Sequence, residues 1–133
     1  MTPDSGDRAP GSPEGACGSG PPAPSPYART YRHGPFTVVE AAGEIDMATA
    51  GLLAVHLDAA TERARPDVLV DLRTVDFFDC SGLRVLCRAD SRAREQGGRL
   101  RLVSESARIR RLLRASGLLG RFPPLPDIPA DPG

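Results

Sequence analysis

The pattern of apolar and polar positions along the middle of the chain alternates between two periods. Blocks rich in β-branched residues, or alternating between basic and apolar residues, predict strands. Blocks whose apolar residues recur every three or four positions predict amphipathic helices. The predicted strands are residues 27–31, 36–44, 68–72 and 99–103, and the predicted helices are residues 47–65, 81–96 and 105–116.

Polar residues and helix breakers predict where the helices begin and end. Asp46 is predicted as the N-cap of the first helix and Pro66 as its stop. Ser104 is predicted to cap the third helix, and Gly117 to end it. The order is ββαβαβα, and helices between strands imply right-handed parallel crossovers. We therefore predict one α/β domain with three helices and a mixed, mostly parallel sheet of four to five strands.

Both ends of the chain differ from the middle in composition. Residues 1–26 contain seven Pro and five Gly, and residues 122–133 contain five Pro. Such segments bury too little apolar surface to offset the entropy that a chain loses on folding. We therefore expect disordered tails at 1–26 and 123–133 and a folded domain over 27–122.

Charge and cysteine usage exclude several classes of protein. Residues 80–121 carry eleven Arg against three acidic residues, although the formal net charge of the chain is zero. We interpret these arginines as solvated helix faces, because no set of aromatic residues for base stacking accompanies them. The three cysteines lack metal-ligand spacing, and the N-terminus lacks the apolar region of a signal peptide. We expect a cytoplasmic protein that binds no nucleic acid and has no membrane span.

Residues that could carry catalysis are scarce. The two histidines lack a nucleophile–base arrangement, His56 being expected as an exposed or half-buried structural residue. A magnesium site made of Asp71, Asp76 and Asp79 is weakly indicated, because these residues are spread along a strand and a turn. We expect no enzyme activity, no metal and no cofactor. A small enzyme that uses Asp79 or Cys80 is the alternative of another class.

The turn Asp79-Cys80-Ser81-Gly82 lies where a predicted strand ends and a helix begins. Binding sites in open α/β sheets form beyond the carboxyl ends of parallel strands, and a helix N-terminus favours an anion. Ser81 is either a plain helix cap or a modification site. A phosphate on it would add negative charge next to Asp79, which would break a docking surface without unfolding the domain.

Several segments together resemble a STAS domain of the anti-sigma-factor antagonist type. They are Gly43-Glu44-Ile45-Asp46, Val70-Asp71-Leu72, residues 75–83, Gly97-Gly98, and the ending from Leu112 to Leu118. The resemblance implies a small cytoplasmic switch protein that binds an anti-sigma factor, often a serine kinase, and so releases a sigma factor. It also implies phosphorylation in the turn by the kinase and reversal by a phosphatase. The final helix usual in the family has no counterpart in the Pro-rich sequence after Phe122.

The resemblance implies a partner-binding set made of Asp46, Asp79, Cys80, Ser81, Gly82 and Leu83. In the family pattern the phosphorylated hydroxyl stands at the position of Cys80. Three outcomes stay open: Ser81 is a substitute acceptor, the protein binds without a switch, or Cys80 provides redox control. The alternative function is an accessory or scaffold subunit of another complex, transporter-associated or stressosome-like, without a phospho-switch.

Overall fold

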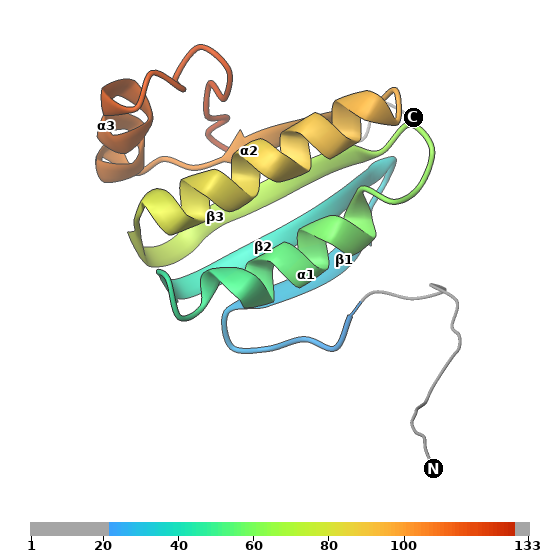
Figure 1. The fold of residues 1–133 in the computed structure, drawn as a ribbon, viewed down its shortest axis with the longest axis horizontal. Coiled ribbons are helices and arrows are strands. Elements are labelled where there is room, and N and C mark those ends of the chain that lie inside the picture. The colour runs from blue at the N-terminus through green and yellow to red at the C-terminus, as the bar shows by residue number, and fades with distance from the viewer. Residues whose placement is uncertain (1–21, 130–133) are drawn as a thin grey trace.

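A computed structural model describes residues 22–129 and contains the elements in the order ββαβαβα (Figure 1). The sheet order is β1-β2-β3-β4, with β1 antiparallel to β2 and the other neighbours parallel. The predicted α/β class, element order and three helices are therefore confirmed, with a sheet of four strands. The elements are β1 (Ala28–His33), β2 (Phe36–Ile45), α1 (Ala50–Ala60), β3 (Asp67–Phe78), α2 (Cys80–Glu95), β4 (Arg99–Val103) and α3 (Ala107–Ala115).

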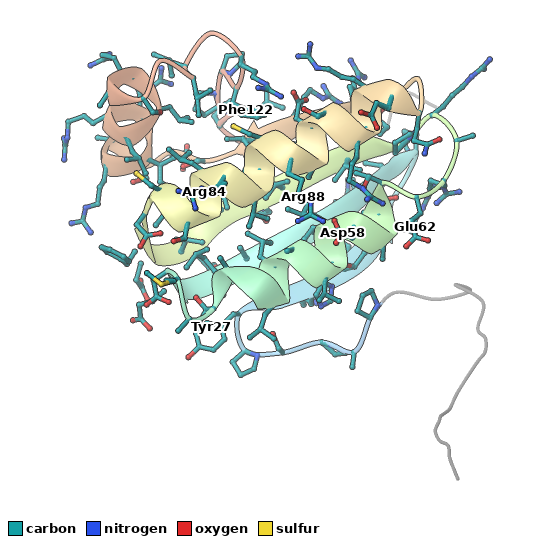
Figure 2. All side chains as sticks on the ribbon, in the orientation of Figure 1. Tyr27, Asp58, Glu62, Arg84, Arg88 and Phe122 are labelled. Carbon is teal, nitrogen blue, oxygen red and sulfur yellow. The ribbon has the colours of Figure 1, made fainter. Side chains whose placement is uncertain are left out.

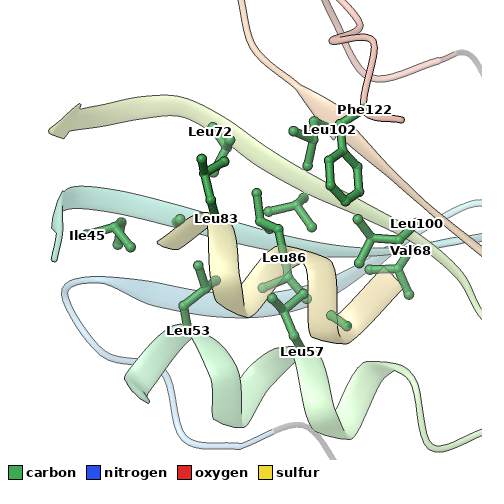
Figure 3. Close-up of a cluster of buried hydrophobic side chains, with 14 of the residues drawn as sticks. Ile45, Leu53, Leu57, Val68, Leu72, Leu83, Leu86, Leu100, Leu102 and Phe122 are labelled. Atoms are coloured by element: carbon green, nitrogen blue, oxygen red, sulfur yellow. The ribbon is translucent and has the colours of Figure 1, made fainter. Parts of the chain in front are cut away.

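Helices α1 and α2 lie side by side on one face of the sheet, and α3 lies beyond the β4 edge (Figure 1). The predicted apolar stripe of α1 is buried, and Leu53 and Leu57 are fully covered. Leu86 of α2 meets them above Val68 and Leu72 of β3 (Figure 3). The large apolar core of the domain is therefore on this face.

The opposite face of the sheet carries a smaller apolar cluster. Its buried members are Phe36, Val38, Leu69 and Val103. Partly buried Tyr31, Leu125 and Ile128 pack against this cluster, Tyr31 from the β1 edge of the sheet and Leu125 from the β4 edge. Two of these covering residues belong to the segment that follows α3, so this segment takes part in the fold.

The composition after Phe122 predicts disorder, but the chain remains in contact with the sheet as far as the structure describes it. The Leu125 N–H donates to the Leu102 carbonyl (2.9 Å), and the Ser104 N–H donates to the Leu125 carbonyl (2.8 Å). Pro124 and Pro126 lack N–H groups, which prevents a regular strand but leaves Leu125 free to pair. The predicted domain end at residue 122 is therefore too early. The predicted tails over 1–21 and 130–133 lie outside the described residues.

The N-terminal segment 22–27 lies along α1 (Figure 1). His56 of α1 has its Nε2 3.2 Å from the Ala23 carbonyl and its Nδ1 2.7 Å from the Thr30 hydroxyl. Burial lowers the pKa of His56, and the bond to Ala23 opposes this effect. His56 is thus a structural residue, as expected, but it is buried rather than exposed or half-buried.

Helix α1 is shorter than predicted. It begins at Ala50 instead of Met47, because Asp46 caps a turn before the helix: its Oδ1 accepts from the N–H groups of Ala48 (2.9 Å) and Thr49 (3.2 Å). The helix ends at Ala60 and not before Pro66. The sequence pattern could not show either end, because Met47, Ala48 and residues 62–65 include good helix formers and the exact ends depend on the cap geometry.

Helix α3 is capped by Ser106 and not by Ser104. The Ser106 hydroxyl accepts from the Ile109 N–H (3.2 Å), whereas Ser104 still pairs its N–H with the segment after α3. The predicted end at Gly117 is confirmed: its φ is +77°, and the Leu118 N–H donates to the Leu113 carbonyl (2.8 Å), as in a Schellman motif.

Candidate functional site

Asp79 connects the end of β3 to the start of α2 and caps this helix. Its backbone is extended, and its Oδ1 accepts from the Ser81 N–H at 2.8 Å. The interpretation of Ser81 as a plain helix cap is therefore wrong, since Asp79 is the N-cap and its carboxylate accepts from the N–H of Ser81, the second residue of α2. The side chain of Ser81 is not required for capping.

The structure brings Asp46 and Asp79 to one edge of the sheet. The Asp79 N–H donates to the Ile45 carbonyl at 3.3 Å, and Ile45 is the β-sheet partner of Phe78. Because parallel strands β2 and β3 end together, the turn after each strand lies beside the other. The starts of α1 and α2 lie at the same end of the molecule (Figure 1).

The predicted site residues differ in their exposure. Cys80 is exposed, and Asp46, Asp79 and Ser81 are half-buried. Gly82 and Leu83 are buried, and Leu83 is only 4% exposed within the main core. Leu83 therefore anchors α2 and offers no surface to a partner.

Gly82 is needed for the packing that supports the site. A Cβ atom at this position would lie 2.5 Å from the ring of Phe78. The first turn of α2 therefore rests directly on the buried Phe78 ring. This close approach places Cys80 and Ser81 at the edge of the sheet.

Two exposed apolar residues next to the site were not predicted. Met47 follows Asp46 and is 86% exposed, and Phe77 precedes the turn and is 45% exposed. Neighbouring residues in a strand point to opposite faces of the sheet, so Phe78 is buried in the main core whereas Phe77 lies on the other face and stays exposed.

The carboxylates considered for magnesium are not brought together. Asp71 is buried on β3 and accepts from Arg73 through Nε and Nη2, both at 3.0 Å. This pairing raises the pKa of Arg73 above its usual range. Residues 22–129 contain no group of three or more His, Cys, Asp or Glu side chains placed to hold a metal ion.

The outer surface of α2 carries arginines, as the sequence predicts. Arg84 and Arg88 lie on the outer side of α2, and Asp58 of α1 lies opposite (Figure 2). Arg92 reaches Asp58 at 3.9 Å across the seam between the helices. Among the residues of the described part, no helix is long and apolar enough to cross a membrane.

A mixed sheet with two helices on one face and an acidic turn at a helix start defines a small α/β domain. A family model described as the STAS domain matches residues 27–128. The chain belongs to the STAS domain family. The matched range also ends after Leu125, in agreement with the pairing of that residue with β4.

Curated relatives and a solved structure carry related names. The anti-sigma-F factor antagonist RsfA of Mycobacterium tuberculosis (strain CDC 1551 / Oshkosh) is 32% identical over 93 residues, which cover 68% of this chain and 72% of the relative. The anti-sigma F factor antagonist of Paenibacillus polymyxa is 27% identical over 92 residues, which cover 68% and 79%. The crystal structure of an anti-sigma factor antagonist from Mycobacterium paratuberculosis matches with a TM-score of 0.67 at 27% identity, covering 76% of this chain and 86% of that chain.

Proposed function

We propose that this protein is an anti-sigma factor antagonist, which binds an anti-sigma factor and so regulates transcription by releasing a sigma factor. The observation that carries the proposal is that Asp46 and Asp79 lie beside each other. The Asp79 N–H donates to the carbonyl of Ile45, the residue before Asp46, at 3.3 Å. This hydrogen bond gathers two carboxylates and the exposed Cys80 on one surface. The names of the relatives support the same function.

In this proposal the protein acts by binding, without catalysis, and it works in the cytoplasm with its partner. A rigid surface suits such a role, because little ordering has to accompany association. Phe78 and Leu83 are buried beneath the turn and pack it against the core, and the cap made by Asp79 fixes the start of α2. Both contacts keep the proposed docking surface rigid.

Regulation in the proposal rests on Ser81. A serine kinase of the anti-sigma type phosphorylates its hydroxyl, and a phosphatase removes the phosphate. The Ser81 N–H is bonded to the Asp79 carboxylate at 2.8 Å, so a phosphate on its hydroxyl would stand near that charge. The added charge would alter the docking surface while the core below stays packed. Cys80 occupies the neighbouring position and is exposed, but it has no hydroxyl to accept a phosphate.

Incubation with the anti-sigma kinase and labelled ATP tests this function. We expect a stable complex before ATP is added, and label on the wild type and on Cys80→Ala but not on Ser81→Ala. We also expect Ser81→Glu to weaken the complex by about tenfold or more, because it adds a like charge beside Asp79. Ser91→Glu, an exposed position at the far end of α2, is the matched control and should bind as the wild type does.

The outcomes separate the proposals from one another. A complex without label would leave an antagonist that lacks the phospho-switch. The absence of a complex with any anti-sigma factor would refute the function, and stable association with a transporter or a scaffold assembly would then support the alternative.

A further inference from the structure

Helix α3 has an unusual charge distribution. Its nine residues include Arg108, Arg110, Arg111 and Arg114 and no acidic residue. All four arginines are exposed, while Ile109 and Leu113 form the buried side of the helix. Nitrogen-tipped side chains extend outward from α3 in Figure 2.

The arginines of α3 differ from most others in the domain. Within residues 22–129, most arginines outside α3 pair with carboxylates, as in Arg73 with Asp71 and Arg121 with Asp90 (2.7 Å), although Arg84 and Arg88 of α2 do not. Within residues 22–129, none of the four arginines of α3 is in an ion pair. Like charges three or four residues apart on a helix repel each other. An anionic partner would therefore reduce the repulsion among the four arginines of α3, which no carboxylate within residues 22–129 neutralises.

An apolar residue lies beside this basic surface. A shallow hollow between the end of β3 and the start of α3 is lined in part by Phe77, Asp76 and Arg108. Arg108 Nη1 donates to the Asp76 carbonyl at 3.2 Å and so joins α3 to the end of β3. Phe77 is nearly half exposed, which suits an aromatic residue that anchors a partner in a hollow.

We propose that α3 and Phe77 form a second docking surface, for an acidic segment of a partner protein that carries an apolar side chain. The arginines bind the carboxylates, and the apolar side chain packs on Phe77. A nucleic acid fits less well, because the carboxylates of Asp76 and Glu105 flank the start of α3 and would repel a continuous row of phosphates. The inference rests on the proposed function only in taking the anti-sigma factor as the natural source of this segment.

Charge reversal tests the surface in the complex with the anti-sigma factor. The double variant Arg110→Glu/Arg114→Glu should bind about tenfold or more weakly, chiefly through a slower association rate, and should lose part of the salt dependence of binding. Arg63→Glu/Arg65→Glu is the matched control, because it changes the net charge equally at exposed positions in the α1–β3 connection, at the other end of the sheet. Equal losses in both variants, or no loss in either, would overturn the inference while leaving the proposed function intact.

A second measurement does not depend on the anti-sigma factor. A synthetic Glu-rich peptide with one Leu and a DNA duplex of equal charge are titrated into isotope-labelled protein. The peptide should shift the amide resonances of α3 and Phe77, and Phe77→Ser should weaken it about fivefold, with Phe77→Leu restoring most of the affinity. Tighter binding of the duplex, or peptide shifts that avoid α3, would contradict the inference even if no anti-sigma factor binds.

Discussion

The two faces of the sheet are stabilised by different means. On one face, leucines of α1 and α2 lie over β2 and β3 in a continuous core (Figure 3). On the other, a cluster of four buried apolar residues is covered by Tyr31, Leu125 and Ile128. Regular helices provide apolar side chains at every turn, whereas an irregular segment provides only a few. The second face therefore depends more on single residues.

Charged side chains complete the cover of the second face. Arg101 lies over the Phe36 ring with its guanidinium carbon 5.4 Å from the ring centre. Arg73 joins the buried Asp71 to Asp127, which it contacts at 2.6 Å. Burial and the nearby Asp71 carboxylate raise the pKa of Tyr31. Long side chains thus cover apolar surface with their stems and keep their charges near water.

The largest expected effect belongs to the helix-covered face. Leu86→Ala should lower the free energy of unfolding by about 2–5 kcal/mol, because it leaves a cavity among fully buried neighbours. Urea denaturation measures this change. Leu52→Ala, at an exposed position on α1, should change it by about 0.5 kcal/mol or less. Similar losses for the two variants would mean that α1 and α2 do not cover the core as described.

A smaller effect is expected on the other face. Leu125→Ala should cost about 1–2 kcal/mol, because the side chain of Leu125 is only half-buried. Amide exchange at Ser104 should become faster, since that N–H donates to Leu125. Asp127→Asn is the control and should cost little, because the carboxylate of Asp127 is largely exposed and its ion pair is screened. Unchanged exchange at Ser104 would show that the segment is not attached through Leu125.

The smallest effect concerns the N-terminal segment and pH. The pKa of His56 is lowered by burial in the folded protein, so the unfolded chain binds the proton more readily. The stabilisation is complete above about pH 6.5, the ordinary pKa of histidine, and is lost as the pH falls toward the lower pKa of the folded state. His56→Gln should flatten this part of the stability–pH curve, and His33→Gln, at the exposed end of β1, should not. A curve for His56→Gln that keeps the slope would assign the effect to other groups.

The sequence pattern was sufficient for most of the fold because each prediction rested on local periodicity. The stripe of α1, with Leu53 and Leu57, and the buried strand at 68–72 follow from spacing alone. The candidate turn was also found from sequence, since it joins a strand to a helix. The roles of the residues within this turn could not be found in the same way, because whether Asp79 or Ser81 caps α2 depends on backbone angles.

By itself, the sequence determined the class of the domain, the order of its elements and the position of the acidic turn. Only the tertiary structure decided which turn residues are accessible, because Leu83 is drawn into the core while Phe77 is left outside. It also decided that Leu125 continues the fold beyond the expected end. The physical reason is the same in both cases. Contacts between residues far apart in the chain leave no period in the sequence, and they determine burial.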